Sequence, residues 1–245
     1  MATVESLRKS LTVETLASYF DLAFFKPYAT YSDYKDLCKE AETYQLKLVC
    51  INSGMVKLCK KILEGSKVHV GGTVGFPLGT VSKEIKLAET LDAIENGADE
   101  IDYVSNMTEL KEKNYTYIEQ EMAGIVKACR EHNITSKVIF ENCFLTDLEK
   151  KELCRIAVEI RPDFIKTSTG YGSGGALESD IRLMKETVGD KVKIKASGGI
   201  RDLDTTLAMI AAGAERIGTS GTEKIMKEFL NVCEPKIQTL MGFEY

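Results

Sequence analysis

Short apolar segments alternate with longer amphipathic segments along almost the whole chain. Eight of the short segments have the length and composition of buried strands, and they span residues 19–23, 46–52, 68–74, 100–104, 137–141, 163–167, 191–196 and 215–219. The stretches between them have helical periodicity. One such stretch covers residues 83–96 and ends before Gly97, a residue typical of a helix C-terminus. Its apolar positions are expected to form one broad face: Ile85, Leu87, Ala88, Leu91 and Ile94.

This alternation continues without a linker, which predicts a single domain over residues 1–245. A weak internal repeat supports a regular pattern, because residues 93–101 and 209–217 share a helix end, a Gly-Ala turn, an acidic residue and a new strand. Eight strands and helices in about 250 residues fit a (β/α)8 TIM barrel, whose reactive groups lie at the C-terminal ends of the strands. An open doubly wound sheet is the competing architecture.

The polar positions within the predicted strands indicate an unusual barrel interior. If the aliphatic face of each strand meets the helices, side-chain alternation turns the other face inward. The charged residues expected to face inward are Glu100, Asp102, Lys137, Glu141, Lys193 and Lys195. Buried charges are costly unless opposite charges compensate them. We expect Glu100, Lys137 and Lys193 to form a charged packing layer and assign them no catalytic role.

Composition narrows the classes of function. The net charge of −5 and pI near 5.3 argue against nucleic-acid binding, which requires concentrated positive charge. Seven cysteines without a C-x-x-C pair predict reduced thiols and a cytoplasmic protein. No apolar run approaches the roughly 20 residues needed to cross a bilayer, so no membrane segment is expected. With only two histidines, a metal site built on histidine is not expected either.

Two lysines close two of the predicted strands and lead directly into loops rich in Gly, Ser and Thr. They are Lys166 and Lys195. A lysine attacks carbonyl groups only when it loses its proton near neutral pH, and a low-dielectric pocket and a nearby second cation both favour that loss. The pair therefore indicates Schiff-base chemistry on a phosphorylated substrate. The simpler interpretation is two ordinary strand-edge lysines with solvated amines.

Four motifs at these strand ends carry a family resemblance. They are Val-Gly-Phe-Pro-Leu-Gly at 74–79, Asp-Glu-Ile-Asp at 99–102, Phe-Ile-Lys-Thr-Ser-Thr-Gly at 164–170 and Lys-Ala-Ser-Gly-Gly-Ile-Arg at 195–201. In this order they resemble the deoxyribose-phosphate aldolases, over most of the chain. The resemblance implies a class I aldolase that cleaves 2-deoxy-D-ribose 5-phosphate to D-glyceraldehyde 3-phosphate and acetaldehyde through a lysine imine. It implies no cofactor and no metal ion, and a homo-oligomer, either a dimer or a tetramer.

The resemblance also implies roles for individual residues. Lys166 would form the Schiff base, Lys195 would be the neighbouring cation that favours its deprotonated form, and Asp102 would be the carboxylate of a proton relay. The chain departs from the family at its first strand. The family often has a threonine two residues after Asp21, where this chain has Ala23, so we expect one hydroxyl to be missing from the site.

The substrate's phosphate is expected at the loops that follow the last three strands. Barrels often build phosphate sites after strands seven and eight, and glycines allow a backbone to approach an anion closely. Taken singly, each of these glycines is more often a turn residue. A cysteine on the second strand matches a family cysteine near the site, and we favour a packing role for it. The candidate substrate- and phosphate-binding residues are Cys50, Thr169, Gly170, Gly198, Gly199, Ser220 and Gly221.

Two other functions are compatible with parts of the sequence. Residues 170–175 satisfy G-x-G-x-x-G and Asp190 follows at a suitable distance, as in a nicotinamide dehydrogenase. That fingerprint normally belongs to the first βαβ unit of a domain, whereas several units precede it here, and it leaves the two lysines unexplained. The other alternative is an inactive barrel that serves as a binding module. NAD binding, a borohydride-trapped imine, or neither would separate the three interpretations.

Overall fold

The computed structural model describes residues 3–240, with the side chains of the last helix described to residue 232, so the ends of the predicted domain (1–2 and 241–245) lie outside this range. Within it, eight parallel strands pair in chain order and close into a barrel. The strands are β1 (Phe20–Phe24), β2 (Leu48–Asn52), β3 (His69–Val74), β4 (Glu100–Val104), β5 (Thr135–Ile139), β6 (Phe164–Lys166), β7 (Lys193–Ser197) and β8 (Arg216–Thr219). The predicted (β/α)8 TIM barrel is thus confirmed, and the open sheet is not formed.

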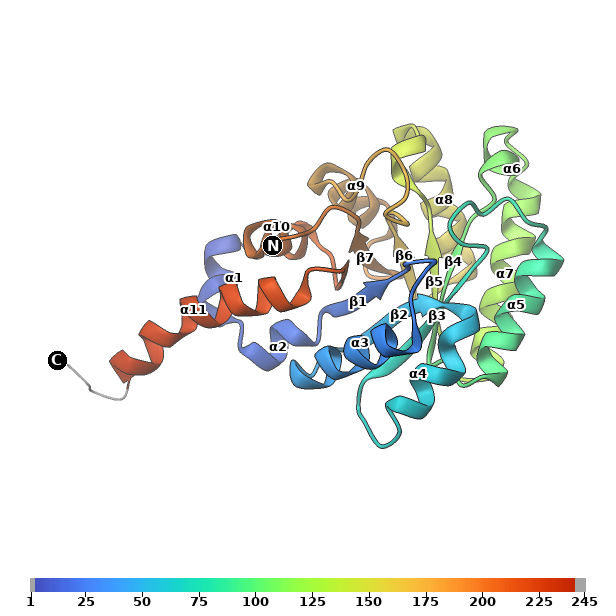
Figure 1. The fold of residues 1–245 in the computed structure, drawn as a ribbon. Coiled ribbons are helices and arrows are strands. Elements are labelled where there is room, and N and C mark those ends of the chain that lie inside the picture. The colour runs from blue at the N-terminus through green and yellow to red at the C-terminus, as the bar shows by residue number, and fades with distance from the viewer. Residues whose placement is uncertain (1–2, 241–245) are drawn as a thin grey trace.

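Helices surround the barrel (Figure 1). They are α1 (Val4–Ser10), α2 (Val13–Ala17), α3 (Tyr31–Thr43), α4 (Val56–Ile62), α5 (Lys83–Glu95), α6 (Met107–Lys111), α7 (Tyr115–Glu131), α8 (Asp147–Ile160), α9 (Glu178–Val188), α10 (Leu203–Ala212) and α11 (Thr222–Leu240), with single 3-10 turns η1 (Ser53–Met55) and η2 (Asn142–Phe144). Many helices begin where a hydroxyl side chain accepts a hydrogen bond from the backbone of the first turn, as Thr30, Ser82 and Thr146 do.

The main hydrophobic core lies between the strands and the helices. Alternate strand residues such as Ile101, Tyr103 and Ile194 are completely buried in this layer. Their neighbours Asp102 and Lys195 are equally inaccessible to solvent but belong to the interior of the barrel, where they contact one another. The predicted separation of an aliphatic outer face from a charged inner face is therefore confirmed for these strands.

Two of the charged residues predicted to face inward do not join that interior cluster. β5 ends at Ile139, and Glu141 has a left-handed backbone with a φ of 57°, so strand alternation does not apply to it. Lys193 is exposed, because it is the first residue of β7 and lies at the N-terminal end of the barrel. Its amine lies 5.6 Å from the centroid of the Phe164 ring.

The apolar face predicted for residues 83–96 is wrong in part, because Ile94 packs against the core but other predicted positions do not. In α5 the side chains of Ile85 and Leu91 are 58% and 43% exposed, whereas the buried positions are Lys86, Thr90 and Ala93. Lys86 can lie on the inner face because its amine meets a carboxylate and a backbone carbonyl there. A buried ion pair has replaced the apolar contact that periodicity predicts.

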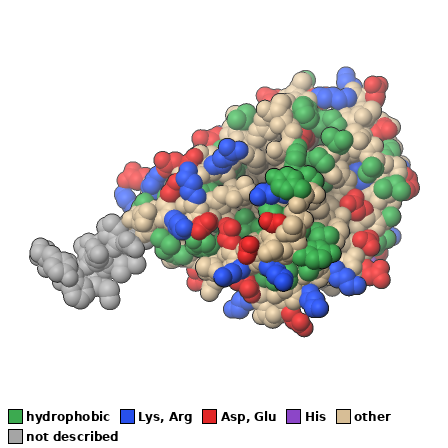
Figure 2. All heavy atoms as spheres, viewed as in Figure 1, with side chains coloured by type: hydrophobic (Ala, Val, Ile, Leu, Met, Phe, Trp, Pro, Cys, Tyr) green, Lys and Arg blue, Asp and Glu red, His purple; other side chains and the backbone are tan. Residues whose placement is uncertain are grey.

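Acidic and basic side chains are interspersed over the face of the molecule shown in Figure 2. None of the described helices is both long enough and apolar enough to span a membrane.

Candidate active site

Strand register brings the predicted catalytic residues to one level of the barrel. Asp102 on β4 pairs in register with Lys137 on β5, and Lys166 on β6 pairs with Lys195 on β7. All four side chains are at most 3% exposed. The residues come from four consecutive strands and point toward the barrel axis, so they meet although they are far apart in the sequence.

Asp102 is the centre of this cluster. Its Oδ2 lies 2.7 Å from the Nζ of Lys166 and 2.7 Å from the Nζ of Lys195. Its Oδ1 accepts a hydrogen bond of 2.7 Å from Lys137. The thiol of Cys50 is 3.7 Å from Oδ2. One carboxylate thus holds three amines together.

A second layer of charges lies beneath this centre. Asp21 contacts Lys195 through Oδ2 at 2.5 Å and accepts from Arg216 through Oδ1 at 2.6 Å. Glu100 accepts two hydrogen bonds of 2.8 Å from Arg216 and lies 2.6 Å from the amine of Lys137. The expectation of a packing layer fits Glu100. Lys137 differs, because it contacts Asp102 directly.

These contacts determine the charge states of the buried groups. Burial disfavours ionisation of Asp102, but Lys137, Lys166 and Lys195 together hold the pKa of that carboxyl well below its usual value. Burial likewise opposes charge on Lys195, yet the carboxylates of Asp102 and Asp21 raise its pKa. For Lys137, burial is again outweighed, here by Asp102 and Glu100, and the pKa is raised. Lys195 is therefore positively charged at neutral pH, beside Lys166.

Counting charges singles out Lys166. Among the described residues of this cluster, the four lysine and arginine side chains are Lys137, Lys166, Lys195 and Arg216, and the three carboxylates are Asp21, Glu100 and Asp102. Glu100 also contacts a histidine, because its Oε1 lies 2.9 Å from His69 Nδ1. Three cations suffice to balance three carboxylates. Lys137, Lys195 and Arg216 each contact at least two of these carboxylates, whereas Lys166 contacts only the Asp102 oxygen that it shares with Lys195. Lys166 is the amine whose neutral form leaves every carboxylate paired.

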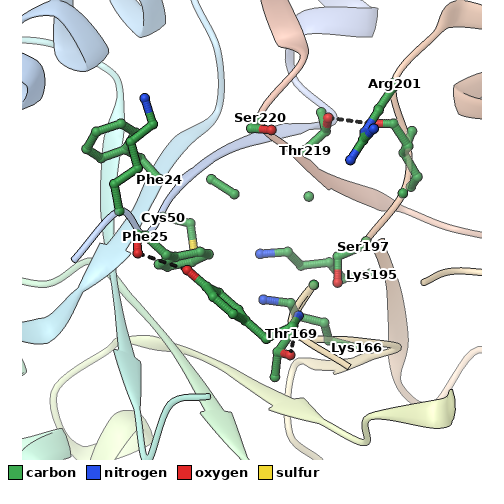
Figure 3. A pocket seen from close by; sticks show the side chains of 18 residues that line it. Phe24, Phe25, Cys50, Lys166, Thr169, Lys195, Ser197, Arg201, Thr219 and Ser220 are labelled. Carbon is green, nitrogen blue, oxygen red and sulfur yellow. Dashed lines mark hydrogen bonds between the residues drawn. The ribbon is translucent and has the colours of Figure 1, made fainter. Parts of the chain in front are cut away.

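A pocket of about 300 Å³ opens above the cluster at the C-terminal ends of the strands. The amines of Lys166 and Lys195 lie side by side and point into it (Figure 3). The thiol of Cys50 also lines the pocket, and burial raises its pKa to about 11, so the thiol form dominates at neutral pH. Ala23 lines it too, at the position where the family hydroxyl was expected to be missing.

Most of the residues predicted to bind phosphate line the same pocket. Gly170, Gly198, Gly199 and Ser220 belong to its wall. Gly170, Gly198 and Gly199 have φ values of 94°, 88° and 76°, a left-handed conformation that only glycine adopts readily. The side chain of Arg201 also lines the wall, near Ser220 (Figure 3). This side of the pocket combines a close backbone approach with a cation, which suits an anion.

Two predicted binding residues have other hydrogen-bond partners. The N–H of Gly221 donates to Thr219 Oγ1 over 2.9 Å, and Gly221 is not among the residues that line the pocket. Thr169 lines the pocket, but its N–H and its hydroxyl both donate to the carboxylate of Glu141. In this structure both residues use their donors to shape loops.

Comparison with known proteins agrees with this geometry. A family model described as DeoC/LacD family aldolase matches residues 13–225. The chain is 51% identical over 214 residues to the deoxyribose-phosphate aldolase of Lactobacillus acidophilus, covering 87% of this chain and 90% of the relative. It is 47% identical over 220 residues to that of Bacteroides thetaiotaomicron, covering 90% of this chain and 92% of the relative. The chain belongs to the DeoC/LacD family of aldolases.

Solved structures of the family have the same fold. A structure described as a tetrameric deoxyribose phosphate aldolase from Aeropyrum pernix matches with a TM-score of 0.86 and 28% identity, covering 94% of this chain and 97% of the other. The family resemblance that the four motifs carry is therefore confirmed, and the protein is an aldolase, which is a lyase. Membership in this family argues against both the dehydrogenase and the inactive barrel.

The glycines of the apparent dinucleotide fingerprint have a packing explanation in this aldolase. A Cβ on Gly172 would lie 2.5 Å from the Sγ of Cys143, and a Cβ on Gly175 would lie 2.2 Å from the carbonyl oxygen of Gly198. The β6–α9 loop therefore needs glycine where it presses against the β5–α8 and β7–α10 loops.

The aldolase site contains residues to which the sequence argument gave no role. Arg201 ends a motif that was recognised, so a cation two residues after Ser-Gly-Gly was an available signal. Asp21 lies on β1 and Arg216 on β8, and only the three-dimensional structure shows that Arg216 donates a hydrogen bond to Asp21. The aromatic residues Phe24 and Phe25 line the pocket and had no signal beyond their position at the end of β1.

Proposed function

We propose that this aldolase cleaves 2-deoxy-D-ribose 5-phosphate to D-glyceraldehyde 3-phosphate and acetaldehyde, with Lys166 as the Schiff-base nucleophile. The observation that carries the proposal is the position of Lys166. It faces the pocket, and it is the amine of the cluster with the fewest carboxylate contacts, beside a cation with a raised pKa. The deoxyribose-phosphate aldolases to which the chain is similar support the choice of substrate.

The proposed reaction begins when the neutral amine of Lys166 attacks the aldehyde carbon C1 of the open-chain sugar. Loss of water from the carbinolamine gives a protonated imine, which acts as an electron sink. Removal of the proton from the C3 hydroxyl then breaks the C2–C3 bond. The electron pair of that bond forms an enamine on Lys166, and the three-carbon aldehyde phosphate leaves. Protonation at C2 and hydrolysis release acetaldehyde and the free amine.

Asp102 and Lys195 are proposed to manage the protons of these steps. Asp102 Oδ2 contacts both amines at 2.7 Å, so it can stabilise the positive charge that develops on the nitrogen of Lys166. The carboxylates of Asp102 and Asp21 raise the pKa of Lys195, so Lys195 is a protonated proton donor beside Lys166. A carboxylate and an ammonium group together can pass a proton to and from the carbinolamine hydroxyl.

The other end of the substrate is proposed to lie against the opposite wall. Gly198, Gly199 and Ser220 offer backbone and hydroxyl donors there, and the guanidinium of Arg201 supplies a positive charge. Gly170 completes this wall from the β6–α9 loop. This division places the imine carbon and the phosphate at different sides of one pocket.

The proposal also covers the cofactor requirement, the metabolic role, the oligomeric state and the compartment of the enzyme. Because the protonated imine is the electron sink, the chemistry requires no cofactor and no metal ion. The substrate links the enzyme to deoxyribose phosphate catabolism. We propose a homo-oligomer, in line with the tetrameric relative from Aeropyrum pernix. Six free cysteines among the described residues fit a reducing compartment such as the cytoplasm.

Trapping the imine tests the proposal. The protein is treated with acetaldehyde and borohydride, and its intact mass and peptides are then analysed. A two-carbon adduct on Lys166 alone is expected, together with cleavage of deoxyribose 5-phosphate. An adduct on Lys195 or Lys137 would change the assignment of the nucleophile. An active enzyme without any adduct would remove Schiff-base chemistry.

A further inference from the structure

Glu141 is a buried carboxylate that the proposed reaction does not use. It follows β5 by two residues and is only 4% exposed. Its oxygens accept hydrogen bonds from the N–H of Thr169 at 3.2 and 3.3 Å, and a short one from the hydroxyl of Thr169. A carboxylate buried to this degree requires strong donors, and Thr169 provides two of them. The contact fixes the start of the β6–α9 loop to the end of β5.

The contact continues from Thr169 to the rim of the pocket. Because the hydroxyl hydrogen of Thr169 points to Glu141, the oxygen is free to accept the N–H of Tyr171 at 3.0 Å. The hydroxyl of Tyr171 in turn donates to the carbonyl oxygen of Phe25 at 2.9 Å. The ring of Tyr171 meets the Phe76 ring edge-on, with centroids 5.7 Å apart and an interplanar angle of 86°. Three loops, after β1, β3 and β6, are joined at this point.

This rim belongs to the same pocket as the reacting amine and the anion-binding wall. Tyr171 and Phe25 line the pocket together with Lys166. Phe25 and Thr169 lie on one side of the pocket, whereas Thr219, Ser220 and Arg201 lie on the other (Figure 3). Movement of the rim would therefore change how a substrate that spans both sides fits, without displacing the amines.

We propose that Glu141 is a positioning residue that sets the specificity of the site for the phosphorylated sugar by holding Thr169 and, through it, Tyr171. The inference rests on the proposed function, since it concerns how the same pocket accepts its substrate. Glu141 touches neither Lys166 nor the anion-binding wall in the described contacts. It acts through the loop.

Glu141→Gln provides the main test. The amide keeps the shape of the side chain but removes its charge and replaces one acceptor oxygen with an NH2 group, so the hydrogen bonds from Thr169 lose an acceptor and become weaker. The KM for deoxyribose 5-phosphate should rise about 3- to 10-fold, the effect of one hydrogen bond, while kcat changes less than about 2-fold. Acetaldehyde has only two carbons and no phosphate, so it contacts Lys166 without extending to the anion-binding wall. Imine trapping with acetaldehyde should therefore proceed as in the unmodified enzyme.

The matched control is Glu149→Gln. Glu149 makes the same kind of contact at the start of α8, where its carboxylate accepts from the N–H of Thr146 at 2.7 Å and from its hydroxyl at 2.9 Å. No change in KM is expected for this variant. For the rim itself, Tyr171→Phe should raise KM in the same direction as Glu141→Gln, whereas Tyr28→Phe, at a tyrosine that is 78% exposed, should not.

Hydrogen exchange separates this inference from the proposed function. In the substrate-free protein, amide exchange in the peptide covering residues 169–175 should be faster in Glu141→Gln than in the unmodified protein and unchanged in Glu149→Gln. Unchanged exchange would refute the positioning role whatever the substrate proves to be. If Glu141→Gln lowered kcat and imine trapping as strongly as it raised KM, the positioning role would be refuted as well. Such a result would indicate a catalytic or general structural role. An unmodified protein that neither cleaves the sugar phosphate nor forms an imine would refute the proposed function alone.

Discussion

The protein buries lysine–carboxylate contacts in two regions that behave differently. Between α5, α7 and the end of β4, the amine of Lys86 lies 2.6 Å from Glu121 Oε1 and donates to the carbonyl oxygen of Val104 at 2.6 Å. The other oxygen of Glu121 accepts from the backbone of Asn106 at 3.1 Å. This is one cation with one carboxylate, and both side chains are fully buried. The barrel interior instead contains several cations around shared carboxylates, under an open pocket.

The two regions shift the pKa values of their groups in opposite directions. Burial lowers the pKa of Lys86 and raises that of Glu121, because a single opposite charge does not fully compensate for desolvation. In the barrel, several opposite charges outweigh burial, so the pKa of Asp102 is lowered and that of Lys195 is raised. The buried pair of Lys86 and Glu121 joins two helices. The barrel cluster has more lysine and arginine side chains than carboxylates and lies beside a pocket, so it leaves one amine, that of Lys166, available for chemistry.

Removing one lysine from each region should separate chemistry from structure most strongly. Lys166→Met should lower kcat/KM for deoxyribose 5-phosphate by on the order of 10⁴-fold or more, because the nucleophile is lost. Lys86→Met should leave kcat of the folded protein within a few-fold. Steady-state kinetics at matched concentrations of folded protein check this. Comparable losses of kcat in both variants would contradict the assignment of catalysis to the barrel cluster and of a structural role to the Lys86–Glu121 pair.

Within the barrel cluster, two substitutions should differ in their dependence on pH. Lys195→Leu removes the cation that shares Asp102 Oδ2 with Lys166, so the dependence of imine formation on pH should change. Asp102→Asn should lower activity by about 10²- to 10⁴-fold at every pH, since the proton-transfer group is absent. Profiles of kcat/KM and of imine trapping against pH measure both. An unshifted Lys195→Leu profile would disprove its electrostatic role.

The Lys86–Glu121 pair should instead affect stability. Lys86→Met leaves Glu121 buried without its cation and should cost about 3–5 kcal/mol of unfolding free energy. The double variant Lys86→Met/Glu121→Leu removes both charges and should recover much of that loss. Urea denaturation followed by circular dichroism measures the three proteins. A double variant as unstable as the single one would show that hydrogen bonds to Val104 and Asn106 matter more than the charge pair.

Acid should weaken the barrel cluster by a smaller amount. The folded-state pKa of Asp102 is lowered, so its contribution to stability is present above its unfolded value of about 3.9 and is lost as pH falls toward the folded value. The unfolding free energy should therefore decrease as the pH falls below about 5. In Asp102→Asn the decrease should be shallower. Urea titrations between pH 3 and 6 provide the comparison, and identical slopes would show that Asp102 does not contribute.

Sequence reasoning succeeded where a pattern was local. The alternation of strands and helices gave the barrel, and lysines at strand ends placed Lys166 and Lys195 at the pocket. It failed for α5, where periodicity favoured Ile85 and Leu91 over Lys86 as the inner face. Hydrophobicity alone cannot predict that a lysine will be buried, because its burial depends on Glu121 in a different helix.

By itself, the sequence determined the order of the elements, the barrel and the family, since each depends on residues close together in the chain. Only the tertiary structure decided which charges share a carboxylate. Asp102 and Lys195 are 93 positions apart and meet because the barrel closes. Closure also decided that Glu141 turns to Thr169 and that Lys166 has the fewest carboxylate contacts in its cluster. The physical reason is that electrostatic energies depend on distances in space and on burial, and neither is a property of a local pattern.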